Sequence, residues 1–150
     1  MKIGIVIPLK AKSISKNWSI VEESLFQTLM SIKNQKCQNF EAVVVGHDCP
    51  SFLENKEQFG DNISFMLFDT RMPPELSSDQ EQNQIKFELD RCSKIYQGYK
   101  YLKGYSVSHV FSLDADDLLR DDFVEFLLEK NTAHSFLIEK GYVFYKSKKI

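Results

Sequence analysis

The chain has 150 residues, a net charge of −2, 43% hydrophobic residues and 13% aromatic residues. This composition argues against a disordered chain and indicates one globular domain with its own core. The charge provides no broad basic surface, so we expect no nucleic-acid partner. Three widely spaced cysteines argue against a disulfide framework or a zinc site and favour the cytoplasm. The first apolar run is too short for a transmembrane segment.

Apolar runs and amphipathic segments alternate along the first third of the chain. Residues 2–7 predict a first strand, apolar from Ile3 to Ile7 as in a central parallel strand, and Pro8 ends this run. Ser19 and Glu22 form a capping-box pattern that predicts the start of a helix. The predicted helix continues to about Asn34, and residues 40–45 form a second strand.

The same alternation continues through the middle of the chain. Residues 63–68 read as a third strand, and the segment 84–103 reads as a long amphipathic helix that Gly104 ends. Its apolar positions are Ile85, Leu89, Cys92, Ile95 or Tyr96, Tyr99 and Leu102. A fourth strand is centred near residue 111. This order predicts a three-layer α/β/α, Rossmann-like fold with a mostly parallel sheet and helices on both faces.

The rest of the chain carries weaker patterns. Residues 52–59 suggest a short helix, and residues 121–131 predict another. Two apolar runs, 136–138 and 142–145, are typical of strands in a small antiparallel C-terminal element.

Carboxylates gather where the fourth strand ends. Asp114 and Asp116 follow the run Val110–Leu113 and lie on one side of an extended chain, so their charges repel unless a cation neutralises them. Hard oxygen ligands of this kind suit Mg²⁺ or Mn²⁺, with phosphate oxygens and water completing the coordination. The alternative is an acid-rich start of the next helix, since acidic side chains complement a helix dipole. A position directly after a buried strand favours the metal site.

Four segments together resemble a known family. They are Ile5-Val6-Ile7-Pro8, the helix segment Leu29-Met30-Ser31-Ile32-Lys33-Asn34-Gln35, the strand Glu41-Ala42-Val43-Val44-Val45, and Leu113-Asp114-Ala115-Asp116-Asp117. In order and spacing, over roughly the first 130 residues, they are similar to the N-terminal, nucleotide-sugar-binding half of GT-A fold glycosyltransferases of family 2.

The resemblance implies a site. The loop after Pro8, which carries Lys10, and the turn at Asp48 would contact the base and ribose of a nucleotide-diphosphate sugar, with a UDP-sugar as the expected donor. Lys94 would face the diphosphate, while Asp114 and Asp116 would hold the metal. The family usually has two acidic residues after the second strand, whereas here Gly46-His47 precedes the single Asp48, which weakens the base contacts.

The resemblance also implies that donor binding and acceptor binding belong to different parts of the enzyme. Residues 1–150 would form a single donor-binding domain that lacks the acceptor-binding C-terminal part, and no residue stands out as the general base. The expected activity is transfer of a sugar to an acceptor hydroxyl, the acceptor being unknown. The alternative is a non-catalytic nucleotide-sugar-binding module, or a fragment without transfer activity.

Overall fold

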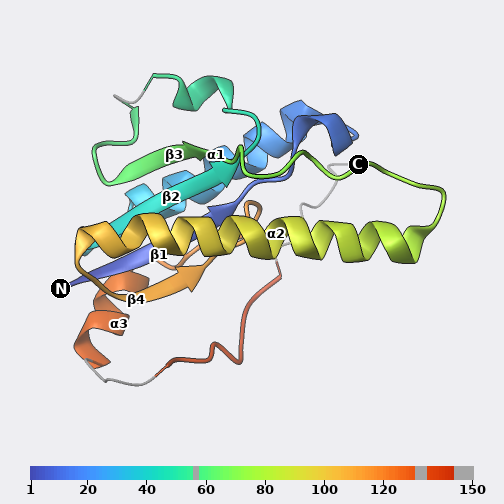
Figure 1. Cartoon of the computed structure of the whole chain (residues 1–150). Coiled ribbons are helices and arrows are strands. Elements are labelled where there is room, and N and C mark those ends of the chain that lie inside the picture. The colour runs from blue at the N-terminus through green and yellow to red at the C-terminus, as the bar shows by residue number, and fades with distance from the viewer. Residues whose placement is uncertain (56–57, 131–134, 144–150) are drawn as a thin grey trace, which may run out of the picture.

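The computed structural model describes residues 1–55, 58–130 and 135–143. Its sheet has the strand order β3-β2-β1-β4, and every neighbouring pair is parallel (Figure 1). The strands are β1 (Lys2–Pro8), β2 (Phe40–Gly46), β3 (Ile63–Leu67) and β4 (Val107–Ser112). The four predicted parallel strands are therefore confirmed.

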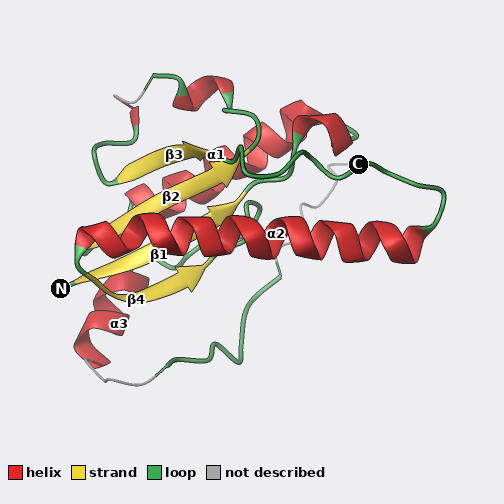
Figure 2. Ribbon diagram, viewed as in Figure 1, coloured by secondary structure: helices red, strands yellow, loops and turns green. Residues whose placement is uncertain are grey.

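Helices cover both faces of this sheet, as Figure 2 shows. The long helices are α1 (Trp18–Lys33) and α2 (Gln80–Leu102), and the short α3 is Phe123–Lys130. One apolar cluster joins α1 and α3 to one face of the sheet, and a second cluster joins α2 to the other face. The predicted α/β/α arrangement is confirmed.

Strand β1 shows why its sequence is apolar after Lys2. Ile3, Ile5 and Ile7 pack with α1 and α3, whereas Val6 packs in the cluster that includes Leu102 of α2. Because successive side chains of a strand point to opposite faces, a strand covered on both sides cannot alternate apolar and polar residues.

Helix α1 begins slightly earlier than the sequence predicts. Its N-cap is Asn17, whose side-chain oxygen accepts a hydrogen bond from the Ile20 amide at 3.4 Å, so the Ser19–Glu22 capping box is wrong. The Glu22 carboxylate instead accepts a hydrogen bond from the Ser51 amide at 2.8 Å. A cap requires extended backbone, which Asn17 has, whereas Ser19 already lies inside the helix.

The other predicted helix bounds change modestly. Asp79 caps α2 by accepting hydrogen bonds from the Glu81 and Gln82 amides, so this helix begins four residues before the predicted 84–103 and ends at Leu102, before Gly104. Where helix 52–59 is predicted, the described residues form a 3₁₀ turn at Ser51–Leu53 and no α-helix, and residues 56–57 lie outside the described part of the chain.

The predicted antiparallel element is not confirmed. Residues 135–143 lie in neither helix nor strand, and residues 144–145 of its second run are outside the described residues. Throughout the described part of the chain, no helix is both long enough and apolar enough to cross a membrane.

Candidate functional site

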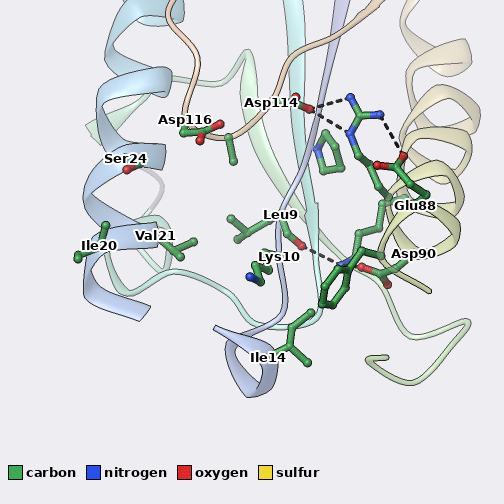
Figure 3. A pocket seen from close by; sticks show the side chains of 15 residues that line it. Leu9, Lys10, Ile14, Ile20, Val21, Ser24, Glu88, Asp90, Asp114 and Asp116 are labelled. Carbon is green, nitrogen blue, oxygen red and sulfur yellow. Dashed lines mark hydrogen bonds and ion pairs between the residues drawn. The ribbon is translucent and has the colours of Figure 1, made fainter. Parts of the chain in front are cut away.

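A pocket of about 710 Å³ opens where β1 and β4 end, beside the middle of α2. Open parallel sheets bind their ligands at this end of the strands. The pocket is lined from β1 and the segment after it by Pro8, Leu9, Lys10 and Ile14, and from α1 by Ile20, Val21 and Ser24. Figure 3 shows these walls converging with α2 and the segment after β4, which provides Asp114, Ala115 and Asp116.

Backbone contacts fix the turn that carries the two aspartates. The Leu113 amide donates to the Val6 carbonyl at 2.9 Å, which continues the pairing of β4 with β1. The Thr28 hydroxyl of α1 then donates to the Ala115 carbonyl at 3.0 Å. Asp114 and Asp116 are thus held from both neighbouring elements and both line the pocket (Figure 3).

Arg91 of α2 pairs with Asp114. Its Nε and Nη2 atoms donate to the same Asp114 oxygen at 3.1 and 2.8 Å, and this bonding raises the pKa of the guanidinium above its usual value. Glu88 lies 3.9 Å from the same guanidinium. Arg91 lines the pocket, and sequence reasoning did not assign it to the site.

Lys94 is buried in the wall of the pocket, with 1% of its surface exposed. Its ammonium donates to the Leu9 carbonyl at 2.8 Å and to the Asp90 carboxylate at 2.5 Å. His47 also contacts Asp90, with its Nε2 atom at 3.1 Å. Lys94 therefore ties the segment after β1 to α2, and burial lowers the pKa of its ammonium.

The remaining predicted residues divide into two groups. Pro8 ends β1 and Lys10 follows it, both in the pocket wall, and the Lys10 ammonium lies 5.5 Å from the centre of the Phe87 ring. Asp48 is not in the lining of this pocket. Its carboxylate accepts a hydrogen bond from the Lys12 amide at 2.8 Å, so it shapes the segment after β1.

The carboxylates can be tested for their fit to a divalent cation. Asp114 and Asp116 offer hard oxygen ligands in one pocket, the donor set that Mg²⁺ and Mn²⁺ prefer. Burial raises the pKa of the adjacent Asp117, and the negative charges of Asp116 and Asp114 raise it further. In the described residues, no group of three or more His, Cys, Asp or Glu side chains could hold a metal. A cation would therefore need oxygen ligands from a bound molecule as well.

Sequence comparison gives no family. No family model matches this sequence, and no curated protein matches it.

Comparison of structures does find a similar fold. The crystal structure of Staphylococcus aureus TarS residues 1–349, a glycosyltransferase, superposes with a TM-score of 0.51 at 17% sequence identity. The match covers 86% of this chain but only 32% of the TarS chain. This chain therefore shares its α/β fold with TarS, and its likeness to the family-2 glycosyltransferases stays a prediction.

Proposed function

We propose that this chain is a donor-binding glycosyltransferase domain whose pocket binds a nucleotide-diphosphate sugar, with a UDP-sugar as the first candidate. The main support for this proposal is that Asp114, Asp116, Lys10 and Arg91 all line one pocket at the ends of parallel strands. Those carboxylates suit a divalent cation, and the two cationic side chains suit a diphosphate. The fold shared with TarS supports this proposal.

Asp114 and Asp116 would hold Mg²⁺ or Mn²⁺ together with the diphosphate. When bound, the metal would supply positive charge that stabilises the diphosphate as a leaving group. Arg91 serves the same end from the protein side, because a guanidinium binds phosphate oxygens in a bidentate manner. Its present bonds to Asp114 hold that guanidinium inside the pocket.

The other wall of the pocket is apolar. Leu9 and Ile14 come from the segment after β1, while Ile20 and Val21 come from the first turn of α1. Side chains of this kind bury the flat faces of a base or a sugar, and the charged wall orients the diphosphate. Asp48 accepts a hydrogen bond from the Lys12 amide, so its proposed part is to position the segment that carries Lys10.

A second candidate is a module that binds the donor without transferring its sugar. The pocket carboxylates Glu88, Asp90 and Asp114 all lie against cationic partners, which disfavours their taking a proton from an acceptor. Transfer needs a base within hydrogen-bond reach of the acceptor hydroxyl. We therefore expect these 150 residues to bind donor and metal, with at most slow hydrolysis and no efficient transfer.

The test is titration calorimetry with UDP and UDP-glucose, with and without Mn²⁺. The wild-type chain should bind more tightly with Mn²⁺, and Asp116→Asn should lose most of that gain while its thermal unfolding is unchanged. Asp61→Asn, an exposed aspartate outside the pocket lining, is the matched control and should bind as the wild type does.

Two results would decide against the proposal. Wild-type protein that binds neither ligand with Mn²⁺ would remove donor binding, and unchanged Mn²⁺ dependence in Asp116→Asn would remove the metal site. Sugar transfer to a defined acceptor with kcat of about 1 s⁻¹ or more would instead remove the binding-module candidate.

A further inference from the structure

The Asp114 carboxylate already has a cationic partner inside the pocket, the Arg91 guanidinium of α2. The Nε and Nη2 atoms of Arg91 donate to Asp114 at 3.1 and 2.8 Å, and both bonds end on one oxygen, Oδ1. A guanidinium that donates to both oxygens of a carboxylate forms the stronger, fork-like pair. Asp114 therefore receives positive charge from the protein itself, through a pair that does not have the strongest geometry open to arginine.

Both members of this pair are open to water. The side chain of Arg91 is 41% exposed and that of Asp114 is 48% exposed. Ion pairs with this much exposure stabilise a fold only weakly, because water solvates both charges when the pair opens. The pair can therefore open while the surrounding sheet and helices stay folded.

Asp114 is held more firmly than Arg91. The residue before Asp114 continues the pairing of β4 with β1, and the Asp117 amide donates to the Asp114 carbonyl at 3.1 Å, so backbone bonds fix this turn on both sides of the carboxylate. Arg91 reaches the carboxylate through a long side chain, and Glu88 of the same helix lies 3.9 Å from its guanidinium. Figure 3 draws the contacts of this guanidinium with Asp114 and Glu88. Arg91 is therefore the member that moves when the pair opens, and Glu88 stays beside it at the pocket.

The other two cationic side chains in the pocket lining, those of Lys10 and Lys94, are placed differently. The Lys94 ammonium is buried and donates to a backbone carbonyl and a carboxylate of this chain. The Lys10 ammonium lies over the Phe87 ring. Among these three described side chains, only that of Arg91 bonds Asp114. Arg91 is thus the cation whose movement changes the charge at this carboxylate.

We propose that Arg91 competes with a divalent cation for Asp114, and that a nucleotide diphosphate relieves this competition by binding the guanidinium through its phosphate oxygens. The inference rests on the proposed function, which assigns the cation and the diphosphate to this pocket. While Arg91 bonds Asp114, the carboxylate shares its charge with the guanidinium, and a cation beside it is repelled. When Arg91 turns to the diphosphate, Asp114 becomes available to the metal. Metal and nucleotide therefore strengthen each other's binding through Arg91.

Titration with Mn²⁺ alone tests the competition, with electron paramagnetic resonance measuring the free metal at one fixed pH. Arg91→Gln should bind Mn²⁺ about threefold to tenfold more tightly than the wild type, because Asp114 then no longer shares its charge with a guanidinium. Arg91→Lys keeps the charge without the planar guanidinium, so its affinity should fall between the two. Thermal unfolding checks that each variant is folded. Equal Mn²⁺ affinities in all three chains, or no Mn²⁺ binding by any of them, would overturn the inference.

Three further variants separate the Asp114 pair from general charge effects. Lys10→Gln removes the same charge from the same pocket without freeing Asp114, so it should tighten Mn²⁺ binding less than Arg91→Gln does. Arg71→Gln changes an exposed arginine outside the pocket lining and should bind as the wild type does. Adding Glu88→Gln to Arg91→Gln should preserve the gain, because Asp114 provides it. Equal gains in Lys10→Gln and Arg91→Gln, or loss of the gain in the double variant, would overturn the inference.

Calorimetry with UDP tests the exchange of Arg91 between its two partners. UDP affinity is measured with and without Mn²⁺, after correction for the Mn²⁺–UDP complex in solution, and the ratio of the two affinities gives the coupling. This ratio should be several-fold smaller in Arg91→Gln than in the wild type, and UDP without Mn²⁺ should bind the variant more weakly. Equal ratios would overturn the inference and leave the proposed function standing. A wild-type chain that binds Mn²⁺ but not UDP would contradict the proposed function and the exchange together.

Discussion

The two long helices lie on opposite faces of one sheet and use their apolar residues in opposite ways. Helix α1 buries Leu25, Leu29 and Ile32 against the sheet, as its sequence pattern predicts. Helix α2 buries Lys94, Gly98 and Leu102 and leaves most of its other apolar positions exposed, namely Ile85, Leu89, Tyr96 and Tyr99. An apolar stripe therefore predicts that a segment is a helix, but it does not always show which side meets the sheet.

Close approach explains the orientation of α2. A Cβ atom added to Gly98 would lie 2.5 Å from Val6 Cγ1 and 3.1 Å from Val45 Cγ2, so only glycine lets the helix backbone come this near to β1 and β2. One turn earlier, Lys94 reaches the Leu9 carbonyl and Asp90. Gly98 and the hydrogen bonds of Lys94 thus determine which side of α2 faces the sheet. In α1 the buried apolar side chains determine it.

The largest expected effect is the difference in stability between the same leucine-to-alanine change made on each helix. Leu29→Ala should lower the free energy of unfolding by about 2–5 kcal/mol, because it empties a fully buried site. Leu89→Ala removes an exposed side chain and should change it by less than about 0.5 kcal/mol. Urea unfolding of dilute, monomeric protein measures both. Equal losses would mean that Leu89 is packed in the monomer.

A smaller effect is expected where α2 touches the sheet. Gly98→Ala should destabilise the fold by about 1–3 kcal/mol, because the new methyl group meets Val6 in a packed layer. Gly104→Ala, with no atom within 4 Å of the new carbon, is the matched control and should be close to neutral. Thermal unfolding compares the two. A stabilised Gly98→Ala would show that helix propensity outweighs the contact.

Much of the fold follows from the sequence, because its strongest patterns are local. Strands β1 and β2 are apolar at nearly every position, which a strand buried on both faces requires. The N-cap of α1 was harder, since Asn17 and Ser19 both suit a cap and only the backbone angles decide between them. The run 136–138 shows the limit. It is apolar enough for a strand, yet the described residues 135–143 lie in no strand.

The sequence predicts the site residues that directly follow the ends of strands. Pro8, Asp114 and Asp116 meet in one pocket because parallel strands end at the same edge. Arg91 was missed because its pairing with Asp114 spans 23 residues and depends on how α2 is rotated. Lys94 lies at the pocket, but its ammonium donates to Leu9 and Asp90 of this chain. The sequence does not show these bonds, because they depend on which side of α2 is buried.

The smallest expected effect is on the pH dependence of the free energy of unfolding. It comes from Lys94, the charged residue that α2 buries where α1 buries uncharged residues. Burial lowers the pKa of Lys94 below the 10.5 of the unfolded chain, so between those two values the unfolded state binds more protons. The free energy of unfolding should therefore rise with pH in this window, as the cost of burying the charge disappears. Lys94→Met lacks the group and should lack this part of the rise. Lys36→Met is the control with the opposite sign. The hydrogen bond to Asp121 raises the pKa of Lys36, so the small stabilisation that this ion pair gives the folded state is lost as pH rises. Urea unfolding at a series of alkaline pH values gives the difference between the wild-type chain and each variant. A difference for Lys94→Met that stays constant as pH approaches 10.5 would show that folding leaves the titration of Lys94 unchanged.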